Sequence, residues 1–231
     1  MALMSEFKPL SLEDGTAAVR FARSVVESRL GLTRNLSQLT SAVSTLRLGV
    51  WVTIEKIIND AGVMRRVVRG SMGSPIPMNR LPMDLALASE YAAFNDPRFS
   101  PLTSAELDHC IFEVTLVGNM RETKRSELNY FVPGHHGLLI RIGRGTRVIL
   151  PQALVEAAIQ KRNGEPFKNR SELHSFICML IGDKCGEKCE SCNGSAYIYD
   201  TQIFYELEPG GRVVERMIYR NKLFTYINQK S

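Results

Sequence analysis

The feature that most constrains the fold is a turn, Asn59-Asp60-Ala61-Gly62, that joins two runs favouring β structure. Residues 49–54, before the turn, are rich in β-branched and aromatic side chains, and residues 63–71, after it, can return as a second strand. Asparagine, aspartate and glycine are residues that tight turns prefer. The pattern predicts a hairpin whose second strand runs into Arg69-Gly70-Ser71-Met72-Gly73.

The rest of the chain lacks the strand–helix–strand rhythm of a parallel sheet. Apolar periodicity and helix stop signals predict helices at residues 11–30, 85–95, 152–162 and 171–181, with a short helix within residues 33–45. Further strands are expected at residues 110–117, 137–142, 146–150, 196–207 and 212–219. The predicted fold class is therefore α+β, with a mainly antiparallel sheet flanked by helices.

Composition places the chain among ordinary globular proteins. It has 231 residues, of which 44% are hydrophobic and 23% charged, and it is long enough for one compact unit. The net charge of +5 favours anionic partners only if it is concentrated on one face. The first fifteen residues lack a basic stretch followed by an apolar run, and no stretch of about eighteen apolar residues occurs. These observations predict a cytoplasmic protein without a membrane span.

Three separated parts of the chain carry a resemblance to a known family. They are Val68-Arg69-Gly70-Ser71-Met72-Gly73, then Ala92-Ala93-Phe94-Asn95-Asp96-Pro97-Arg98-Phe99-Ser100-Pro101-Leu102, and Gly137-Leu138-Leu139-Ile140 leading to Leu150-Pro151-Gln152. Over residues 20–205 the chain resembles the AMMECR family, named from the Alport syndrome and elliptocytosis chromosomal region, in its prokaryotic form.

The resemblance implies a fold but no particular activity. The implied architecture is a single α+β domain over residues 1–231, with two unequal lobes and a cleft between them. The larger lobe is expected from the N- and C-terminal parts, and the smaller lobe from the middle of the chain.

The first of these segments departs from the family signature, which reads leucine-arginine-glycine-cysteine-isoleucine-glycine. This chain has Val68, Ser71 and Met72 in place of the leucine, the cysteine and the isoleucine. A thiolate can attack a substrate or bind a metal at neutral pH, whereas a serine hydroxyl needs a neighbouring base. Ser71 is therefore a catalytic candidate only as a hydrogen-bond donor or a weak nucleophile.

The same segment is the leading candidate for an anion site. If residues 65–71 are extended, alternation places Arg65, Arg69 and Ser71 on one face. The two glycines permit close backbone approach, so that N–H groups could join the arginine around a phosphate or carboxylate. The binding candidates of the segment are Arg69, Gly70, Met72 and Gly73.

Asp96 and Arg98 are further binding candidates, since the family-like segment contains both. A structural interpretation stays open for each part of the site. Asp96 can form a side-chain turn before Pro97, with Phe99 as an anchor. The two glycines can equally make a tight exit from the strand, while Arg69 pairs with an acid such as Asp96 or Glu113.

The cysteines Cys185, Cys189 and Cys192 lie close together in the sequence, with Cys178 seven residues upstream of the first. A structural zinc site, a disulfide and free thiols all remain open, and the spacing also resembles a triad that holds an iron–sulfur cluster. Cys178 is expected to point inward from its helix. The sequence leaves the cofactor unknown, with a structural zinc ion at this cysteine cluster as one candidate.

The adjacent histidines His135 and His136 suggest a metal, but extended geometry argues against it. Consecutive side chains of a strand point to opposite faces, so one ion could bind only one of them without a turn. Arg141, Arg144 and Arg147 lie near a glycine-rich turn without interleaved aromatic residues, so nucleic acid is not an expected partner.

Two functions follow from the sequence. The first is an anion-binding cleft at residues 69–73 of an enzyme that modifies a nucleotide or another anionic metabolite, with a histidine or an acid as base. The second is a non-catalytic protein-binding or adaptor module, in which the family-like segments form a surface for a protein partner.

Overall fold

The chain divides into two compact units. The computed structural model describes residues 7–124, 128, 131–142, 145–163, 165–182 and 195–216. Unit 1 comprises Met1–Gly118 with Gln202–Met217, and unit 2 comprises Asn119–Thr201 with Ile218–Ser231. Two long strands, β3 (Cys110–Lys124) and β6 (Ser195–Glu206), contribute residues to both units. The single domain and the cleft that the resemblance implies stay predictions.

The strands pair in antiparallel fashion. Besides β3 and β6, they are β1 (Gly49–Asp60), β2 (Val63–Ser74), β4 (His136–Ile142), β5 (Gly145–Ile149) and β7 (Val213–Glu215). Their order is β2-β1-β3-β6-β4-β5, with β7 beside β6. The pairs β1–β2, β1–β3, β4–β5, β4–β6 and β6–β7 are antiparallel. With the flanking helices, this arrangement confirms the predicted α+β class.

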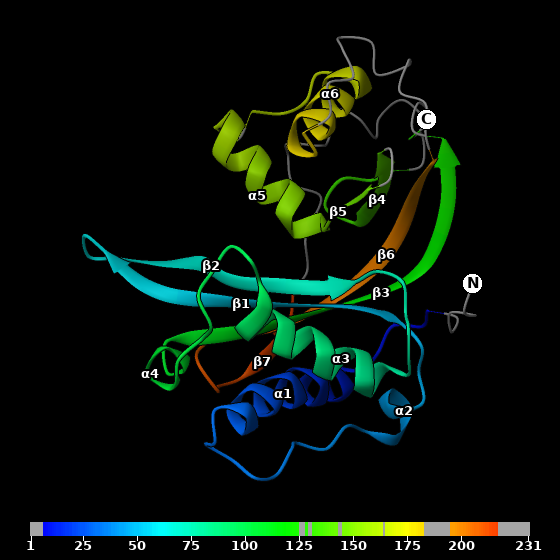
Figure 1. The fold of residues 1–231 in the computed structure, drawn as a ribbon. Helices are drawn as coiled ribbons and strands as arrows, with labels where there is room; N and C mark the ends of the chain where they lie inside the picture. The colour runs from blue at the N-terminus through cyan, green and yellow to red at the C-terminus, as the bar shows by residue number, and fades with distance from the viewer. Residues whose placement is uncertain are drawn as a thin grey trace. The chain divides into compact units, whose positions relative to one another are not determined.

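Two long helices of unit 1 lie on the same side of strands β1 and β2 (Figure 1). Helix α1 (Leu12–Arg29) begins with a capping box between Ser11 and Asp14, as the predicted start indicated. Helix α3 (Leu81–Glu90) continues into one π-helical turn, η1 (Tyr91–Asn95). The short helices are α2 (Ser41–Ser44) and α4 (Ser104–Leu107).

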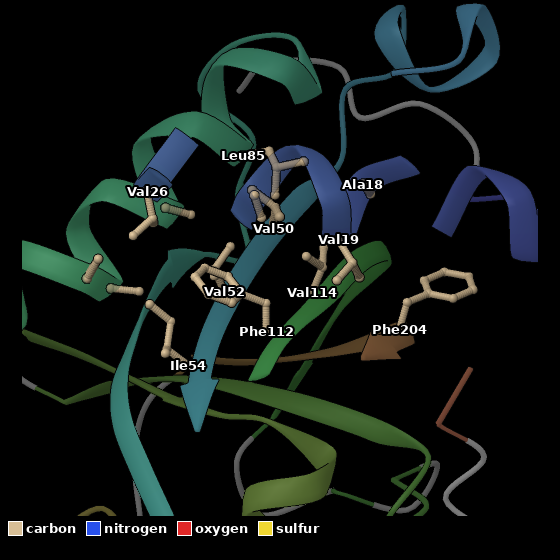
Figure 2. Packing of buried hydrophobic residues seen from close by; sticks show 14 of the residues in the cluster. Ala18, Val19, Val26, Val50, Val52, Ile54, Leu85, Phe112, Val114 and Phe204 are labelled. Atoms are coloured by element: carbon tan, nitrogen blue, oxygen red, sulfur yellow. The ribbon is translucent and has the colours of Figure 1, made fainter. Parts of the chain in front are cut away.

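The core of unit 1 follows from strand alternation. Val50, Val52 and Ile54 of β1 point to the helices and are at most 2% exposed (Figure 2). They pack in one cluster with Phe112 and Val114 of β3, and with side chains of α1 and α3. The intervening residues of β1, which include polar ones, point to the opposite face of the sheet.

Unit 2 has a separate core. Its helices are α5 (Pro151–Arg162), which ends at Asn163 in the left-handed conformation, and α6 (Arg170–Leu180). Apolar residues of both helices pack against Leu138 and Ile140 of β4. None of the helices in the described part of the chain is long and apolar enough to cross a membrane.

Three parts of the predicted secondary structure were wrong in extent. Helix α3 begins at Leu81, because Pro82 occupies its first turn, where no N–H is needed. No helix was predicted between residues 95 and 110, where the short helix α4 begins at Ser104. The long strands β1 and β3 extend well beyond their predicted ends. In β1, pairing with β2 supports outer residues that lack a β-like sequence.

Candidate functional site

The family-like segment at residues 69–73 lies within β2, near the C-terminal end of that strand. Gly70 pairs with Ile54, but Glu55 pairs with Val68, so Arg69 is the extra residue of a β-bulge. The bulge interrupts the alternation predicted for residues 65–71. Arg69 and Ser71 are therefore not two neighbours on one continuous face.

The glycines of the segment are needed for close approach and not for an unusual φ angle. A Cβ atom on Gly70 would overlap the carbonyl oxygen of Ala92 in η1. A Cβ atom on Gly73 would overlap the backbone of Val50 and Trp51 in the neighbouring strand. Neither glycine has a positive φ angle. Backbone packing of β2 against its neighbours accounts for both positions.

Arg69 is engaged by an acid of the protein itself. Its Nε donates to Oε1 of Glu106 at 3.0 Å, and one terminal nitrogen donates to Oε2 at 3.0 Å, which makes a bidentate ion pair. The same nitrogen also lies 3.4 Å from the carbonyl oxygen of Pro101, and Lys56 adds a second cation to Glu106 at 3.3 Å. The hydrogen bonds from Arg69 hold the pKa of Glu106 at about 2. Structural pairing was among the sequence interpretations, but the acid is Glu106.

The hydroxyl of Ser71 lies in a small hydrogen-bond network. Trp51 Nε1 donates to Ser71 Oγ at 2.8 Å, and Thr53 Oγ1 lies 2.9 Å from the same oxygen. Among the described residues, no carboxylate or histidine lies within hydrogen-bond distance of Ser71 Oγ. A base that could deprotonate this hydroxyl is therefore not part of the geometry, and the catalytic role of Ser71 stays a prediction.

Asp96 occupies the place where an anion was expected. Its Oδ2 accepts the Ser71 N–H at 2.8 Å, and Arg98 donates to both carboxylate oxygens, at 2.9 and 2.7 Å. The Arg98 N–H closes the predicted side-chain turn at 3.1 Å. The hydrogen bonds from Arg98 lower the pKa of Asp96 to about 2, so the carboxylate stays ionised at neutral pH. The arginine and the strand N–H thus hold an internal anion.

A small, mainly apolar hollow lies beside residues 72–74 of β2, next to α3 and η1. It encloses about 280 Å³ and is lined in part by Met72, Met78, Leu87 and Tyr91. The charged residue in its lining is Asp84, whose oxygens accept N–H groups of the loop 78–79 at 2.8 to 2.9 Å. The hollow therefore offers mainly carbon surface, and its one carboxylate is already hydrogen-bonded by the loop.

Exposed apolar residues surround this hollow. Met83, Leu87 and Tyr91 follow one another at four-residue intervals along α3 and η1, which places them on one face of the helix. Met83 is 58% exposed, and Met78, in the loop before the helix, is 74% exposed. We call the hollow and these four side chains the α3 surface. This surface was not predicted from the sequence, although Met83, Leu87 and Tyr91 show helical spacing.

The adjacent histidines lie closer together than the predicted geometry allowed. His135 ends a turn and His136 begins β4, so their ring centroids are 4.7 Å apart. Ligand atoms of both rings and of Asp200 lie within 4.8 Å of one another, which is a spacing that a metal could bridge. The sequence interpretation applied to two extended residues, and the turn that it named as the exception is present here.

The hydrogen bonds of His136 do not suit a metal ligand. Its Nδ1 accepts the Val132 N–H at 3.0 Å, so the neutral ring carries its proton on Nε2. That nitrogen lies 3.4 Å from Oδ1 of Asp200, which also accepts from Arg121 at 3.0 Å. A metal ion at Nε2 would have to displace this proton, and it would lie close to the positively charged guanidinium of Arg121. Nδ1 of His136 therefore fixes the turn, while Nε2 faces Asp200 of β6.

The cysteine cluster lies outside the described residues, since residues 183–194 contain Cys185, Cys189 and Cys192. The zinc site, the disulfide, the free thiols and the iron–sulfur cluster therefore stay predictions. Cys178 is buried in α6, which agrees with its expected inward position. Burial raises the pKa of the Cys110 thiol to about 11, so Cys110 is not a reactive thiolate at neutral pH.

The fold and the site together define a class: an α+β protein with an internally satisfied polar segment and an apolar hollow beside it. The AMMECR1 family model matches residues 19–175. The chain belongs to the AMMECR1 family.

Its relatives include uncharacterised archaeal proteins. A protein of Thermofilum pendens is 34% identical over 222 residues, covering 90% of this chain and 97% of that protein. A protein of Caldivirga maquilingensis is 33% identical over 227 residues, covering 91% of this chain and 93% of its own length. The crystal structure of an uncharacterised protein from Pyrococcus horikoshii has the same fold, with a TM-score of 0.69, 23% identity, and coverage of 91% of this chain and 99% of that one.

Proposed function

We propose that the protein is a non-catalytic binding module, and that a protein partner inserts an apolar side chain into the hollow of the α3 surface. The observation that carries this proposal is the continuity of the hollow with an exposed apolar rim. Contiguous exposed apolar surface in a folded protein marks interaction sites. The family-like segment contributes Met72 and Gly73 to the hollow, and of these two residues Gly73 matches the family signature.

The size and the chemistry of the hollow favour a side chain over a metabolite. Its volume of about 280 Å³ lies just below the range of about 300 to 1,000 Å³ typical of small-molecule sites. Asp84 already accepts three N–H groups of the loop, which leaves it little capacity for a polar ligand, and its negative charge would repel an anion. Methionine side chains adapt to the shape of what they contact, and Met72 and Met78 supply two. An aliphatic or aromatic anchor is the occupant that fits.

The anion-binding enzyme predicted from the sequence has weaker support. Capture of a free anion by Arg69 would compete with Glu106, and capture by Arg98 and the strand N–H would compete with Asp96. Each competitor is a covalently tethered carboxylate at high effective concentration. The two acids have pKa values near 2, so neither can serve as a base at neutral pH. The cytoplasmic location predicted from the sequence belongs to the same proposal.

A site-specific photocrosslinker tests the proposal. Leu87→p-benzoylphenylalanine places the probe at the hollow, and the same replacement of Ile159, an exposed apolar residue of α5, is the matched control. Both proteins are irradiated in cells of the source organism, and adducts are identified by mass spectrometry. We expect one polypeptide to be captured from position 87, and not from position 159.

A variant at the rim of the hollow tests whether the crosslink depends on this site. Met78→Glu puts a charge at the rim of the hollow on an exposed side chain, so it should leave the fold intact and abolish the adduct. An adduct that persists in Met78→Glu, or that forms equally at position 159, contradicts the proposal. Arg69→Ala tests the competing function: if phosphate raises the melting temperature of the wild type and not of this variant, the anion site is supported.

A further inference from the structure

The outer half of strand β2 has an open edge. In the strand order, β2 is terminal, so its pairing partner among the described residues is β1 alone. The C-terminal half of β2 is covered, because η1 packs against Gly70 and Asp96 accepts the Ser71 N–H. All residues from 63 to 68 are exposed. We call residues 63–68 the β2 edge. Figure 1 shows this part of the hairpin extending past the helices of unit 1.

The pairing of the neighbouring strands shows which N–H and C=O groups of the β2 edge point away from β1. The Ile57 N–H donates to the carbonyl oxygen of His109 at 2.8 Å, so the backbone of Ile57 points toward the β3 side of β1. Its cross-strand partner Arg66 then belongs to a pair without β1–β2 hydrogen bonds, and the Arg66 N–H and C=O point outward. By alternation, the same holds for Met64 and Val68. Because the bulge at Arg69 adds one residue, Ser71 also falls at an outward position, and its N–H does point away from β1.

The side chains of the β2 edge have a symmetrical pattern. One face carries Met64, Arg66 and Val68, and the other carries Val63, Arg65 and Val67, so each face has an arginine between two apolar residues. The apolar residues are well exposed, with Met64 at 64% and Val63 at 57%. An exposed apolar edge strand is a template for pairing with another chain.

We infer that the β2 edge docks an extended segment of a protein partner by strand addition, and that this segment has two adjacent acidic residues flanked on each side by two apolar residues. Three outward N–H and C=O pairs supply the main-chain hydrogen bonds. The acidic residues lie opposite Arg65 and Arg66, and the apolar ones lie opposite their neighbours. Because the pattern reads the same in both directions, it holds for parallel and antiparallel addition.

Charge argues against a second copy of this chain as the occupant. When two β2 edges pair in antiparallel fashion, the outward backbone groups of one must meet those of the other, and two registers do this with the largest number of paired residues. These place Arg66 opposite the Arg66 of the other copy, or Arg65 opposite its Arg65. Like charges directly opposite each other are destabilising. Arg65 shares its charge with exposed Asp60 at 3.1 Å, and one Arg66 nitrogen lies 3.3 Å from the carbonyl oxygen of Leu207, so each guanidinium keeps further N–H groups for an acid.

The inference does not rest on the proposed function, because the β2 edge and the α3 surface share no residue. The probe is a fluorescein-labelled, end-blocked peptide of sequence Thr-Val-Val-Glu-Glu-Val-Val-Thr, and its control has lysine in place of both glutamates. Fluorescence anisotropy with the full chain should show at least tenfold tighter binding of the glutamate peptide. Binding of the glutamate peptide that is absent up to millimolar protein, or no tighter than that of the lysine peptide, overturns the inference.

Protein variants separate strand addition from charge attraction alone. Val68→Pro removes an outward N–H without removing a β1–β2 hydrogen bond, and Val68→Thr keeps that N–H. We expect at least a tenfold loss of binding for the proline variant and less than a threefold loss for the threonine variant, with Met64→Pro as a second proline variant should the first fail to fold. Arg66→Glu should reverse the peptide preference. Equal binding by folded proline and threonine variants, or an unchanged preference in Arg66→Glu, overturns the inference, whereas Leu87→Glu should leave peptide binding unchanged.

Discussion

The carboxylate of Asp96 connects the family-like strand to the loop that follows η1, and removing its charge should cost measurable stability. Asp96→Asn keeps the size of the side chain but leaves the two Arg98 donors and the Ser71 N–H facing a neutral amide. The pKa of Asp96 falls from 3.8 to about 2 on folding, and about 1.36 kcal/mol per unit makes this a contribution on the order of 2 kcal/mol. The Asp96 side chain is 2% exposed but that of Arg98 is 57% exposed, so solvent screens the pair in part and about 2 kcal/mol is an upper value.

The sign of the pH dependence follows from the lowered pKa. Because the folded pKa lies below the unfolded one, the stabilisation is fully present above about pH 4 and is lost as the pH falls through about 2. Urea unfolding followed by circular dichroism should give a free energy of unfolding up to about 2 kcal/mol lower for Asp96→Asn than for the wild type at pH 7. The difference should shrink steadily between pH 4 and pH 2.

A matched control uses an aspartate on the surface. Asp108 is exposed and follows α4, so Asp108→Asn should change the free energy of unfolding by less than about 0.5 kcal/mol at pH 7. A difference for Asp96→Asn that is equally small, or one that stays constant from pH 7 to pH 2, would refute the reasoning that Asp96 acts as a folded-state anion.

Three further outcomes are expected. Gly70→Ala should destabilise the protein by about 3 kcal/mol or more, because its Cβ has no room, whereas Gly145→Ala should cost less than about 1 kcal/mol in the same thermal unfolding assay. Cys110 should escape iodoacetamide at pH 8 in the native protein and react once the protein is unfolded, as peptide mass spectrometry can show; native labelling would contradict its burial. Glu106→Gln should lower the free energy of unfolding at pH 7 by about 1 to 2 kcal/mol, since Arg69 loses a charged partner; an unchanged value would contradict the bidentate pair.

The sequence was sufficient for the fold class and for most elements because the local signals agree with the tertiary structure. The hairpin turn at residues 59–62 and the helix start at Ser11 depend on side chains that act within a few residues. The ends of β1 and β3 were not predicted: the outer residues of β1 are held by pairing with β2, and β3 continues to Lys124. The π-helical turn at Tyr91–Asn95 was also invisible, since its sequence reads as ordinary helix.

The contacts of the candidate site could not be predicted from the sequence, and its role as a functional site stays a prediction. Alternation is a reliable guide only in a regular strand, and the bulge at Arg69 has no local signature. The acid that pairs with Arg69 is Glu106, 37 residues away, so neither spacing nor composition could select it over the other acids. The α3 surface could have been predicted, because Met83, Leu87 and Tyr91 show helical spacing on a face of the helix that the core does not use.

The most direct test of the proposed function is the affinity of the purified partner captured at position 87. Isothermal titration calorimetry would compare the wild type, Leu87→Glu and the control Ile159→Glu. The partner's buried side chain should contribute at least about 2 kcal/mol to binding. Leu87→Glu puts a charge in the wall of the hollow and should remove this contribution, which weakens binding by about 30-fold or more. Ile159→Glu should bind like the wild type. Equal dissociation constants for all three proteins would contradict the assignment of the α3 surface as the binding site.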